Sequence, residues 1–350
     1  MSSHGFGHLA QVSPVLNELR DRFSEFHLTI RSALPYSVLA GRIKGEFDHI
    51  ATSTDIGMCM AHALKVLPHE TALAHAALHE NWNALVAKEA GMLRKLAPDL
   101  VLSDVSYLAI ASAARAGIPS IGMCSLNWAD IYWSYCKNEP GAAEIRSQML
   151  DAYQQVDLFL KTTPAMPMAD LSNTREIGVI APVAKNRKAE IKQAMGLSEG
   201  EKLVLIAMGG VQFRLPMEHW PQMQGLRWVV PMAWGIERSD TIPLESLGMP
   251  FYDVMASCDA VIGKPGYGTF AEAGMNGVPM LYVPRPDWPE EPYLVTWLSR
   301  VGRCMPVIPE KLAQGDLQED LTALWQLPEK KAIKADGILQ AAEIIHVFMD

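Results

Sequence analysis

The segment SHGFGH, residues 3–8, combines two histidines with two glycines near the start of the chain. Histidine gains or loses its proton near neutral pH, so His8, with His4 as second candidate, could act as a general base. Asp104 ends the apolar run DLVLSD, and a carboxylate beside a histidine orients the ring and stabilises its protonated form. Simpler roles stay open: His8 could only hydrogen-bond within its loop, and Asp104 could cap a helix.

Two further glycine-bearing turns follow apolar runs and could contact phosphate. Residues 208–212, MGGVQ, follow the run KLVLIA, and residues 263–269, GKPGYGT, begin at the end of the run DAVIG. Glycine lets backbone N–H groups approach an anion closely, and a helix that follows adds its positive end. Neither turn has the P-loop pattern, and GFGHLA is a poor match to the dinucleotide fingerprint, so a nucleoside triphosphatase is excluded. Thr269 and Glu272 also fit a capping box, which needs no ligand.

These candidates must be positioned by short apolar runs that alternate with amphipathic helical segments. The expected strands are residues 28–30, 99–104, 118–123, 202–208, 226–230, 259–263 and 278–283. Such alternation predicts an α/β protein with right-handed βαβ units and parallel sheets. Periodicity pauses in the proline-rich segment 162–173, which indicates a domain boundary near 165–180 and a ligand cleft between two halves. Only Met-Ser-Ser precedes the first glycine loop, so its strand is either a stub or lies upstream.

Composition limits the class of protein. Of the 350 residues 49% are hydrophobic and 20% charged, which is typical of a soluble globular chain. A net charge of −9 argues against a nucleic-acid partner. Five scattered cysteines without a CxxC pair predict neither a disulfide framework nor a zinc site, and fit a reducing compartment. No apolar run reaches the roughly 18 residues of a membrane span and no signal peptide opens the chain, so we expect a cytoplasmic protein.

The block of residues 251–302 resembles the donor-binding half of the GT-B glycosyltransferases, which include plant UDP-glycosyltransferases and the N-acetylglucosaminyltransferase that completes lipid II. The whole chain more closely resembles the glycosyltransferase-like N-terminal half of plant L-arabinokinases and stand-alone bacterial relatives. This resemblance rests on five motifs in the same order: SHGFGHLAQ, DLVLSDVSYLAIASAARAGIPSI, NWADIY, GKPGYGTFAEA and PEEPYL.

The resemblance implies the GT-B fold, in which two Rossmann-like parallel-sheet domains face each other across a cleft. Residues 1–168 would form an N-terminal acceptor domain with a truncated first strand. Residues 169–335 would form the C-terminal nucleotide-sugar donor domain, and residues 336–350 a C-terminal helix that packs back on the N-terminal domain.

The implied reaction is an inverting displacement, in which an acceptor hydroxyl attacks the anomeric carbon of a nucleoside-diphosphate sugar, most simply a UDP-sugar. His8 would be the base, with Asp104 as its partner and His4 as the alternative. No DxD motif is present, so neither a metal nor a cofactor other than the sugar nucleotide is required. The residues expected to bind the donor are Gly209, Gly210, Phe251, Lys264, Gly266, Tyr267, Gly268, Thr269, Glu272, Glu290 and Glu291. On the acceptor side, Trp128 and Trp133 would stack on a sugar ring or belong to the core.

The chain departs from the family pattern at two places. Gly263-Lys264-Pro265-Gly266 replaces the His-Cys-Gly-Trp that begins the plant donor signature, and Glu290-Glu291 stands where many relatives have Asp-Gln or Gln-Gln. Two carboxylates accept hydrogen bonds from sugar hydroxyls but would repel a uronic acid. Two alternatives therefore stay open: a non-catalytic nucleotide-sugar-binding module, since close relatives are fused to a kinase, and a UDP-N-acetylglucosamine 2-epimerase on the same fold.

Overall fold

The computed structural model describes residues 1–210, 213–331 and 333–349, and the chain divides into two compact units. Unit 1 comprises Met1–Ile180, Trp288–Glu290 and Asp336–Asp350, and unit 2 comprises Ala181–Asp287 and Glu291–Ala335. The division after Ile180 lies at the upper end of the expected boundary interval. The chain returns to unit 1 twice, once for three residues and once for its C-terminal segment.

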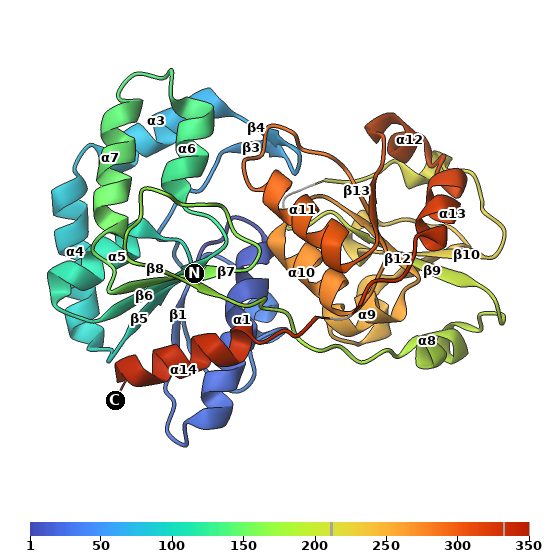
Figure 1. Cartoon of the computed structure of the whole chain (residues 1–350), viewed down its shortest axis with the longest axis horizontal. Helices are drawn as coiled ribbons and strands as arrows, with labels where there is room; N and C mark the ends of the chain where they lie inside the picture. Colours follow the sequence, from blue (N-terminus) through green and yellow to red (C-terminus); the bar gives the residue numbers. More distant parts are fainter. Residues whose placement is uncertain (211–212, 332, 350) are drawn as a thin grey trace. The chain divides into compact units, whose positions relative to one another are not determined.

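Unit 1 contains a four-stranded parallel sheet in the order β5-β6-β7-β8 (Figure 1). Its strands are β5 (Val101–Ser103), β6 (Ser120–Cys124), β7 (Leu158–Thr162) and β8 (Thr174–Ile177). Two short strands, β1 (Thr29–Arg31) and β2 (Asp48–Ile50), form a separate parallel pair, and β3 (Met60–His62) pairs with β4 (Lys65–Val66) in antiparallel fashion. All five residues of β6 are buried, as expected for a strand whose two faces are both covered.

The helices of unit 1 account for most of its remaining residues. They are α1 (Phe6–Arg22), α2 (Tyr36–Ala40), α3 (Pro68–His79), α4 (Trp82–Leu96), α5 (Tyr107–Ala116), α6 (Trp128–Cys136), α7 (Ala142–Tyr153) and α14 (Gly337–Met349). The last of these packs against the first, so the C-terminal helix lies alongside α1 within unit 1 (Figure 1). Helix α5 begins where the Ser106 side chain accepts a hydrogen bond from the Ala109 N–H group, a typical N-cap.

Aromatic side chains fill the core of unit 1. Trp128, Tyr153 and Phe159 are each at most 1% exposed. The Tyr153 hydroxyl donates to the Val105 carbonyl at 2.5 Å and accepts from the Trp128 N–H group at 3.0 Å. One tyrosine on α7 therefore ties together the loops that follow β5 and β6, which are the loops where Asp104 and Trp128 lie.

Unit 2 contains a six-stranded parallel sheet in the order β11-β10-β9-β12-β13-β14. Its strands are β9 (Lys202–Ala207), β10 (Leu226–Val230), β11 (Thr241–Pro243), β12 (Ala260–Gly263), β13 (Met280–Tyr282) and β14 (Cys304–Pro306). Its helices are α8 (Lys188–Met195), α9 (Phe251–Ser257), α10 (Tyr267–Met275), α11 (Glu291–Val301), α12 (Pro309–Gln314) and α13 (Gln318–Gln326), with 3-10 turns η1 (Met217–His219), η2 (Met232–Trp234) and η3 (Leu244–Leu247).

The order of strands in unit 2 reverses direction between β9 and β12. From β9 the chain moves outward to β10 and β11, and it then returns to β12 on the other side of β9. In open α/β sheets this switch point opens a crevice beyond the carboxyl ends of the two strands, where ligands usually bind. No helix within the described part of the chain is long and apolar enough to cross a bilayer.

Candidate functional site

His8 and Asp104 lie in contact in unit 1, although 96 positions of sequence separate them. His8 stands in the first turn of α1, and Asp104 directly follows β5. Nδ1 of His8 is 3.3 Å from Oδ2 of Asp104, an ion-pair distance, and the two side chains are 8% and 1% exposed. Because the carboxylate faces Nδ1, it favours the tautomer that carries its proton there and leaves the lone pair on Nε2.

The surroundings of the pair favour its charged form. Burial by itself lowers the pKa of His8, but its contacts with Asp104 and Cys124 outweigh burial and raise that pKa well above the ordinary value. Burial likewise tends to raise the pKa of Asp104, yet the N-terminal ammonium group, His8 and the Ser2 N–H group together lower it. The buried pair therefore retains the His8 proton to higher pH than a free imidazole would.

The alternative role of Asp104 as a helix cap is wrong, because Ser106 caps α5. The Asp104 carboxylate instead accepts hydrogen bonds from the N–H group of Ser2, at 3.0 and 2.9 Å, and from that of Val105 at 2.8 Å. Asp104 therefore fixes the beginning of the chain as well as His8.

His4 lies between two tryptophan rings of unit 1. Its ring centroid is 5.2 Å from that of Trp128 in an edge-on arrangement and 6.4 Å from that of Trp288 in a stacked one. His8 also contacts Trp128, at 5.7 Å between ring centroids. The indole of Trp128 thus lies beside both candidate bases.

The two acceptor-side tryptophans differ in their environment. Trp128 is 1% exposed and donates from Nε1 to Asp55 at 2.8 Å, so in this structure it has the core role that the sequence left open. Trp133 is partly buried, and the Arg146 guanidinium lies 5.3 Å from its ring centre. A cation over this face occupies one surface on which a sugar ring could stack.

Two of the expected donor turns meet at the switch point of unit 2. Gly263 ends β12 and is in register with Ala207 at the end of β9, so the turns that follow leave the sheet from adjacent strands. A side chain at Gly263 would come within 2.6 Å of the Ala207 carbonyl oxygen, which explains the glycine there. Gly209 has a φ of +85°, and a Cβ atom built on it would lie 3.7 Å from Nζ of Lys264. A Cβ atom on Gly266 would lie at the same distance from that ammonium group.

Helix α10 starts directly at this turn. Its N-cap is Gly266, and no side chain caps the helix. The capping-box alternative for Thr269 and Glu272 is therefore wrong, because Thr269 already lies inside the helix. The amino end of this nine-residue helix, where the helix dipole is positive, therefore lies at the turn that follows β12. Glu272 is 2% exposed, one turn further along α10.

The remaining expected donor residues of unit 2 differ in their exposure. Phe251 opens α9 after Pro250 and is partly exposed. Tyr267 and Gly268 form the buried first turn of α10. Gly210 is exposed after β9. Val211 and Gln212, the rest of that turn, lie outside the described residues.

The expected acidic pair does not act as a pair. Glu290 belongs to unit 1, where its Oε1 accepts from the Ser125 hydroxyl at 2.6 Å and its Oε2 from Nε1 of Trp288 at 3.2 Å. Glu291 belongs to unit 2, where its carboxylate accepts a hydrogen bond from the Arg285 N–H group. Burial raises the pKa of Glu291, partly offset by Arg285. Both carboxylates are thus engaged by protein groups in this structure.

Sequence reasoning missed the polar network around Glu290. Nε2 of Gln11, on α1, donates to the Ser125 hydroxyl at 3.1 Å, and the Thr162 hydroxyl donates to Oε1 of Gln11 at 3.1 Å. The three donors come from α1, the loop after β6 and the end of β7. Ser125 lies just past the predicted strand 118–123, and polar residues at the carboxyl ends of strands are often functional, so its position was an available signal. Thr162 gave no such signal, because it ends β7, which was not predicted.

Comparisons with known proteins bear on the fold. No protein-family model matches the chain. Over 313 residues the chain is 25% identical to an L-arabinokinase of Arabidopsis thaliana. This match covers 85% of this chain and 29% of the plant protein. The chain therefore spans less than a third of that relative. It is also 21% identical over 291 residues to an uncharacterized glycosyltransferase of Methanopyrus kandleri, covering 79% of this chain and 83% of that protein.

Solved structures resemble the chain over nearly its full length. The calicheamicin glycosyltransferase CalG4 matches with a TM-score of 0.64 at 15% identity, covering 99% of this chain and 96% of that one. The glycosyltransferase VinC, in complex with dTDP, matches with a TM-score of 0.51 at 15% identity, covering 100% and 94%. A Listeria monocytogenes protein provisionally named a UDP-N-acetylglucosamine 2-epimerase matches with a TM-score of 0.55 at 16% identity, covering 99% and 93%. The predicted resemblance is thus confirmed, and the chain has the α/β GT-B fold.

Proposed function

We propose that the protein is a glycosyltransferase that moves a sugar from a nucleoside-diphosphate sugar, expected to be a UDP-sugar, to an acceptor hydroxyl with inversion at the anomeric carbon. The observation that carries the proposal is the switch point of unit 2. There the glycine turns after β9 and β12, the Lys264 ammonium and the amino end of α10 converge. These groups suit a diphosphate, because each offers N–H donors or positive charge to phosphate oxygens.

Leaving-group stabilisation would come from the same groups. As the bond between the anomeric carbon and the diphosphate oxygen breaks, negative charge grows on the phosphate, and fixed donors stabilise that charge at little reorganisation cost. A hydrogen bond to a charged group contributes about 1.5–3 kcal/mol. Glu272 would bind the ribose, and Thr269 and Gly268 would add donors to the diphosphate.

The proposed base is His8. Its Nε2 would take the proton of the acceptor hydroxyl as the new bond to the anomeric carbon forms, and Asp104 would stabilise the imidazolium ion that results. The ion-pair distance of 3.3 Å between the two residues supports this role. Since the pKa of His8 is raised, we expect the rate to rise with pH through a midpoint above the ordinary pKa of histidine.

Binding of nucleotides tests the donor site. Titration calorimetry with UDP, GDP, dTDP and ADP should show selective binding, with the dissociation constant rising at least about tenfold, or 1.4 kcal/mol, in Lys264→Met and Glu272→Ala. Lys330→Met is the matched control, because Lys330 is an exposed residue beyond α13, and its affinity should be unchanged. Absence of nucleotide binding by folded wild-type protein would contradict the proposed function.

Transfer assays then separate the alternatives. His8→Gln should bind the preferred nucleotide sugar normally but lose transfer, whereas His69→Gln should keep both, because the His69 side chain is 68% exposed. Equal transfer by His8→Gln would remove His8 from the mechanism. Binding without turnover for every acceptor tested would favour the non-catalytic module, and a C2 epimer formed without acceptor would favour the epimerase.

A further inference from the structure

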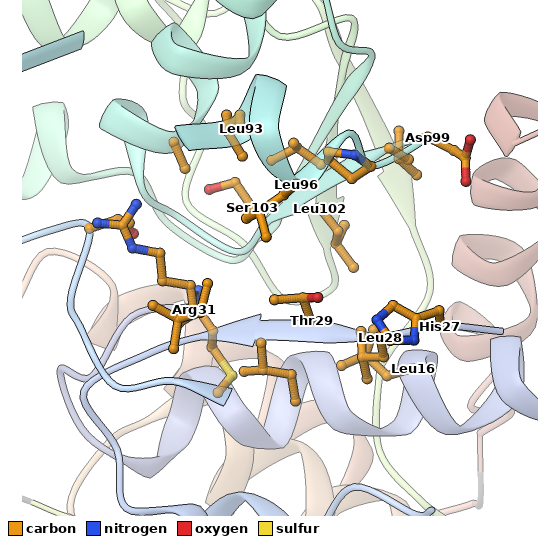
Figure 2. Close-up of a pocket in the computed structure, with 18 of the residues that line it drawn as sticks. Leu16, His27, Leu28, Thr29, Arg31, Leu93, Leu96, Asp99, Leu102 and Ser103 are labelled. Atoms are coloured by element: carbon orange, nitrogen blue, oxygen red, sulfur yellow. Dashed lines mark hydrogen bonds between the residues drawn. The ribbon is translucent and has the colours of Figure 1, made fainter. Parts of the chain in front are cut away.

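Two cavities of the structure differ in the chemistry of their walls. A cavity of about 330 Å³ in unit 1 is lined mostly by apolar side chains, among them Leu16, Leu93 and Leu102 (Figure 2). A cavity of about 300 Å³ in unit 2 is lined mostly by polar and charged residues. The second cavity therefore combines the size of a small-molecule site with the charged groups that recognise a polar ligand.

The polar cavity lies at the amino ends of the strands of unit 2. Lys202 is the first residue of β9, and Asp259 and Arg303 directly precede β12 and β14. The turns expected to hold the sugar nucleotide follow the opposite, carboxyl ends of β9 and β12. Since a strand rises about 3.3 Å per residue, the six residues of β9 put roughly 16 Å between the two edges of the sheet. A ligand in this cavity would thus be separate from the donor turns.

Three cationic side chains from different elements line this cavity. Lys188 begins α8, Lys202 begins β9, and Arg303 precedes β14. Their side chains are 29%, 44% and 18% exposed, so protein encloses more than half of each and solvent screens their charges less than on an open surface. Together with Asp259 and Trp325, which also line the cavity, we call them the basic pocket.

The carboxylate of Asp259 balances part of this charge. Its Oδ1 accepts from Nζ of Lys188 at 2.6 Å and from Nζ of Lys202 at 3.3 Å. Its Oδ2 accepts from the Leu203 N–H group at 2.8 Å. Burial tends to raise the pKa of Asp259, but these three donors outweigh burial and lower that pKa, so the carboxylate is ionised at neutral pH. Because an ammonium group has three N–H donors, each lysine can still donate to a further acceptor.

Arg303 is paired much more weakly. Within residues 1–210, 213–331 and 333–349, the only carboxylate in ion-pair range of its guanidinium is that of Glu329, at 4.0 Å. The Glu329 side chain is 87% exposed, and such surface pairs contribute little. A guanidinium presents its N–H donors in a fork that matches two oxygens of a phosphate or carboxylate. The geometry thus leaves Arg303 able to bind an anion.

The helix ends at this cavity do not balance the remaining charge. Residues at the carboxyl ends of α9 and α10 also line it, and each such end carries at most about half a negative charge. With Asp259, this gives at most about two negative charges against the three positive ones. An excess of about one positive charge therefore remains around the hollow, and it attracts an anion.

We propose that the basic pocket binds the phosphate group of a small phosphorylated metabolite. The Arg303 guanidinium would hold two phosphate oxygens, and Lys188 and Lys202 would donate to the others while they stay paired with Asp259. A phosphate ester suits the pocket better than a carboxylate, because it carries about −1.5 to −2 charge and three acceptor oxygens.

Trp325 supplies a surface for the organic part of this ligand. Its Nε1 donates to the Asp259 carbonyl at 2.9 Å, which fixes the ring, and the Lys202 ammonium lies 4.9 Å from the ring centre. An aromatic face of this kind packs against the C–H groups of a sugar. The volume of about 300 Å³ matches a sugar phosphate and is too small for a segment of nucleic acid.

The test titrates the full chain, labelled with ¹⁵N, with glucose 6-phosphate and in parallel with glucose. The indole N–H signal of Trp325, assigned with Trp325→Phe, should shift saturably with the phosphate ester and stay in place with glucose. In calorimetry, Arg303→Met should raise the dissociation constant of glucose 6-phosphate at least about tenfold. Arg303→Lys, which keeps the charge but loses the fork, should raise it less. Arg300→Met is the matched control and should bind as the wild type does, because Arg300 is exposed on α11 and does not line the cavity.

Four results would overturn the proposal. Equal affinities of Arg303→Met and Arg300→Met would show that the ligand does not use this pocket. No shift of the Trp325 signal at millimolar glucose 6-phosphate would show that the cations serve only Asp259 and the helix ends. Equally tight binding of inorganic phosphate would identify a free ion as the ligand. Shifts of Gly266 and Gly268 without one of Trp325 would place the phosphate at the donor turns alone. Because UDP binding is followed at those glycines, this proposal and the proposed function can fail separately.

Discussion

Replacing Asp104 by asparagine tests the proposed catalytic pair most sharply. The substitution keeps the size of the side chain but removes the negative charge that lies 3.3 Å from Nδ1 of His8. Without that charge, burial dominates, and burial lowers the pKa of His8. We therefore expect the pKa of His8 to be clearly lower in Asp104→Asn than in the wild type. Two-dimensional NMR of the imidazole signals, with His8→Gln to assign the peak, measures this directly.

The energetic cost follows from the burial of the pair. Removing one partner of a buried ion pair costs about 3–5 kcal/mol, and the asparagine oxygen can still accept from the Ser2 N–H group, so we expect the lower end. A loss of about 3 kcal/mol lowers the melting temperature of a domain of this size by about 6–12 °C.

The effect on activity differs in kind from the effect on stability. In the wild type kcat/KM should rise with pH through the raised pKa of His8. In Asp104→Asn the midpoint should move to lower pH, while the plateau falls about 10²- to 10⁴-fold, because the ring is no longer held in the required tautomer. Histidine signals whose midpoint is the same in both proteins would refute the assigned interaction. An unchanged plateau would refute the catalytic role alone.

Three further predictions concern stability. Gly263→Ala should destabilise unit 2 by about 1–3 kcal/mol, because the new methyl group meets a backbone oxygen at 2.6 Å. Gly91→Ala, inside α4 where no other atom is close, should stabilise unit 1 by about 0.5–1 kcal/mol. Thermal melts that rank the two variants otherwise would contradict this packing. Burial lowers the pKa of His75 to about 4, so as the pH falls the unfolded chain binds a proton before the folded chain does. The free energy of unfolding of unit 1 should therefore fall by about 3 kcal/mol between pH 6.5 and pH 4. A free energy from urea unfolding that does not change over this range would argue against a buried neutral ring. Ser125→Ala should lower the free energy of unfolding by about 1.5–3 kcal/mol, because it removes a donor from the buried carboxylate of Glu290. Glu290→Gln should lower it less, because the amide oxygen can still accept a hydrogen bond from Ser125. The reverse order in urea unfolding would contradict the network.

The buried strands were predictable because their apolar runs are covered on both faces. The run LRWVV predicts β10 with its observed bounds, and DAVIG predicts β12 within one residue. Strand β8 was missed because its residues, TREI, are mostly polar and it lies at the edge of the sheet. Strand β14 was missed because three residues carry too little periodicity. Strand β7 was missed as well, although it lies between β6 and β8 in the sheet. The pattern thus located most of the central strands but not all of them.

The contact between His8 and Asp104 was predictable, because His8 lies at the start of an expected helix and Asp104 at the end of an expected strand in the same half of the chain. The bonds of Asp104 to Ser2 were not, since they depend on how the first residues fit between two separate sheets. The sequence also suggested one joint role for Glu290 and Glu291. Glu290 is the last residue before α11 and Glu291 is the first residue of that helix, so the two side chains point in different directions and find different partners. The sequence does not show that the helix begins between them.

The donor site at the switch point of unit 2 is the central claim, and its most direct test is glycine-selective ¹⁵N NMR during titration with UDP. We expect the backbone amide signals of Gly209, Gly210, Gly266 and Gly268 to shift saturably, because these groups would face the diphosphate. The signals of Gly91, inside α4, and of Gly117, the residue that caps the C-terminus of α5, should stay in place, because both lie in unit 1. Shifts confined to glycines outside the two turns, or no shift at millimolar UDP in folded protein, would contradict the account.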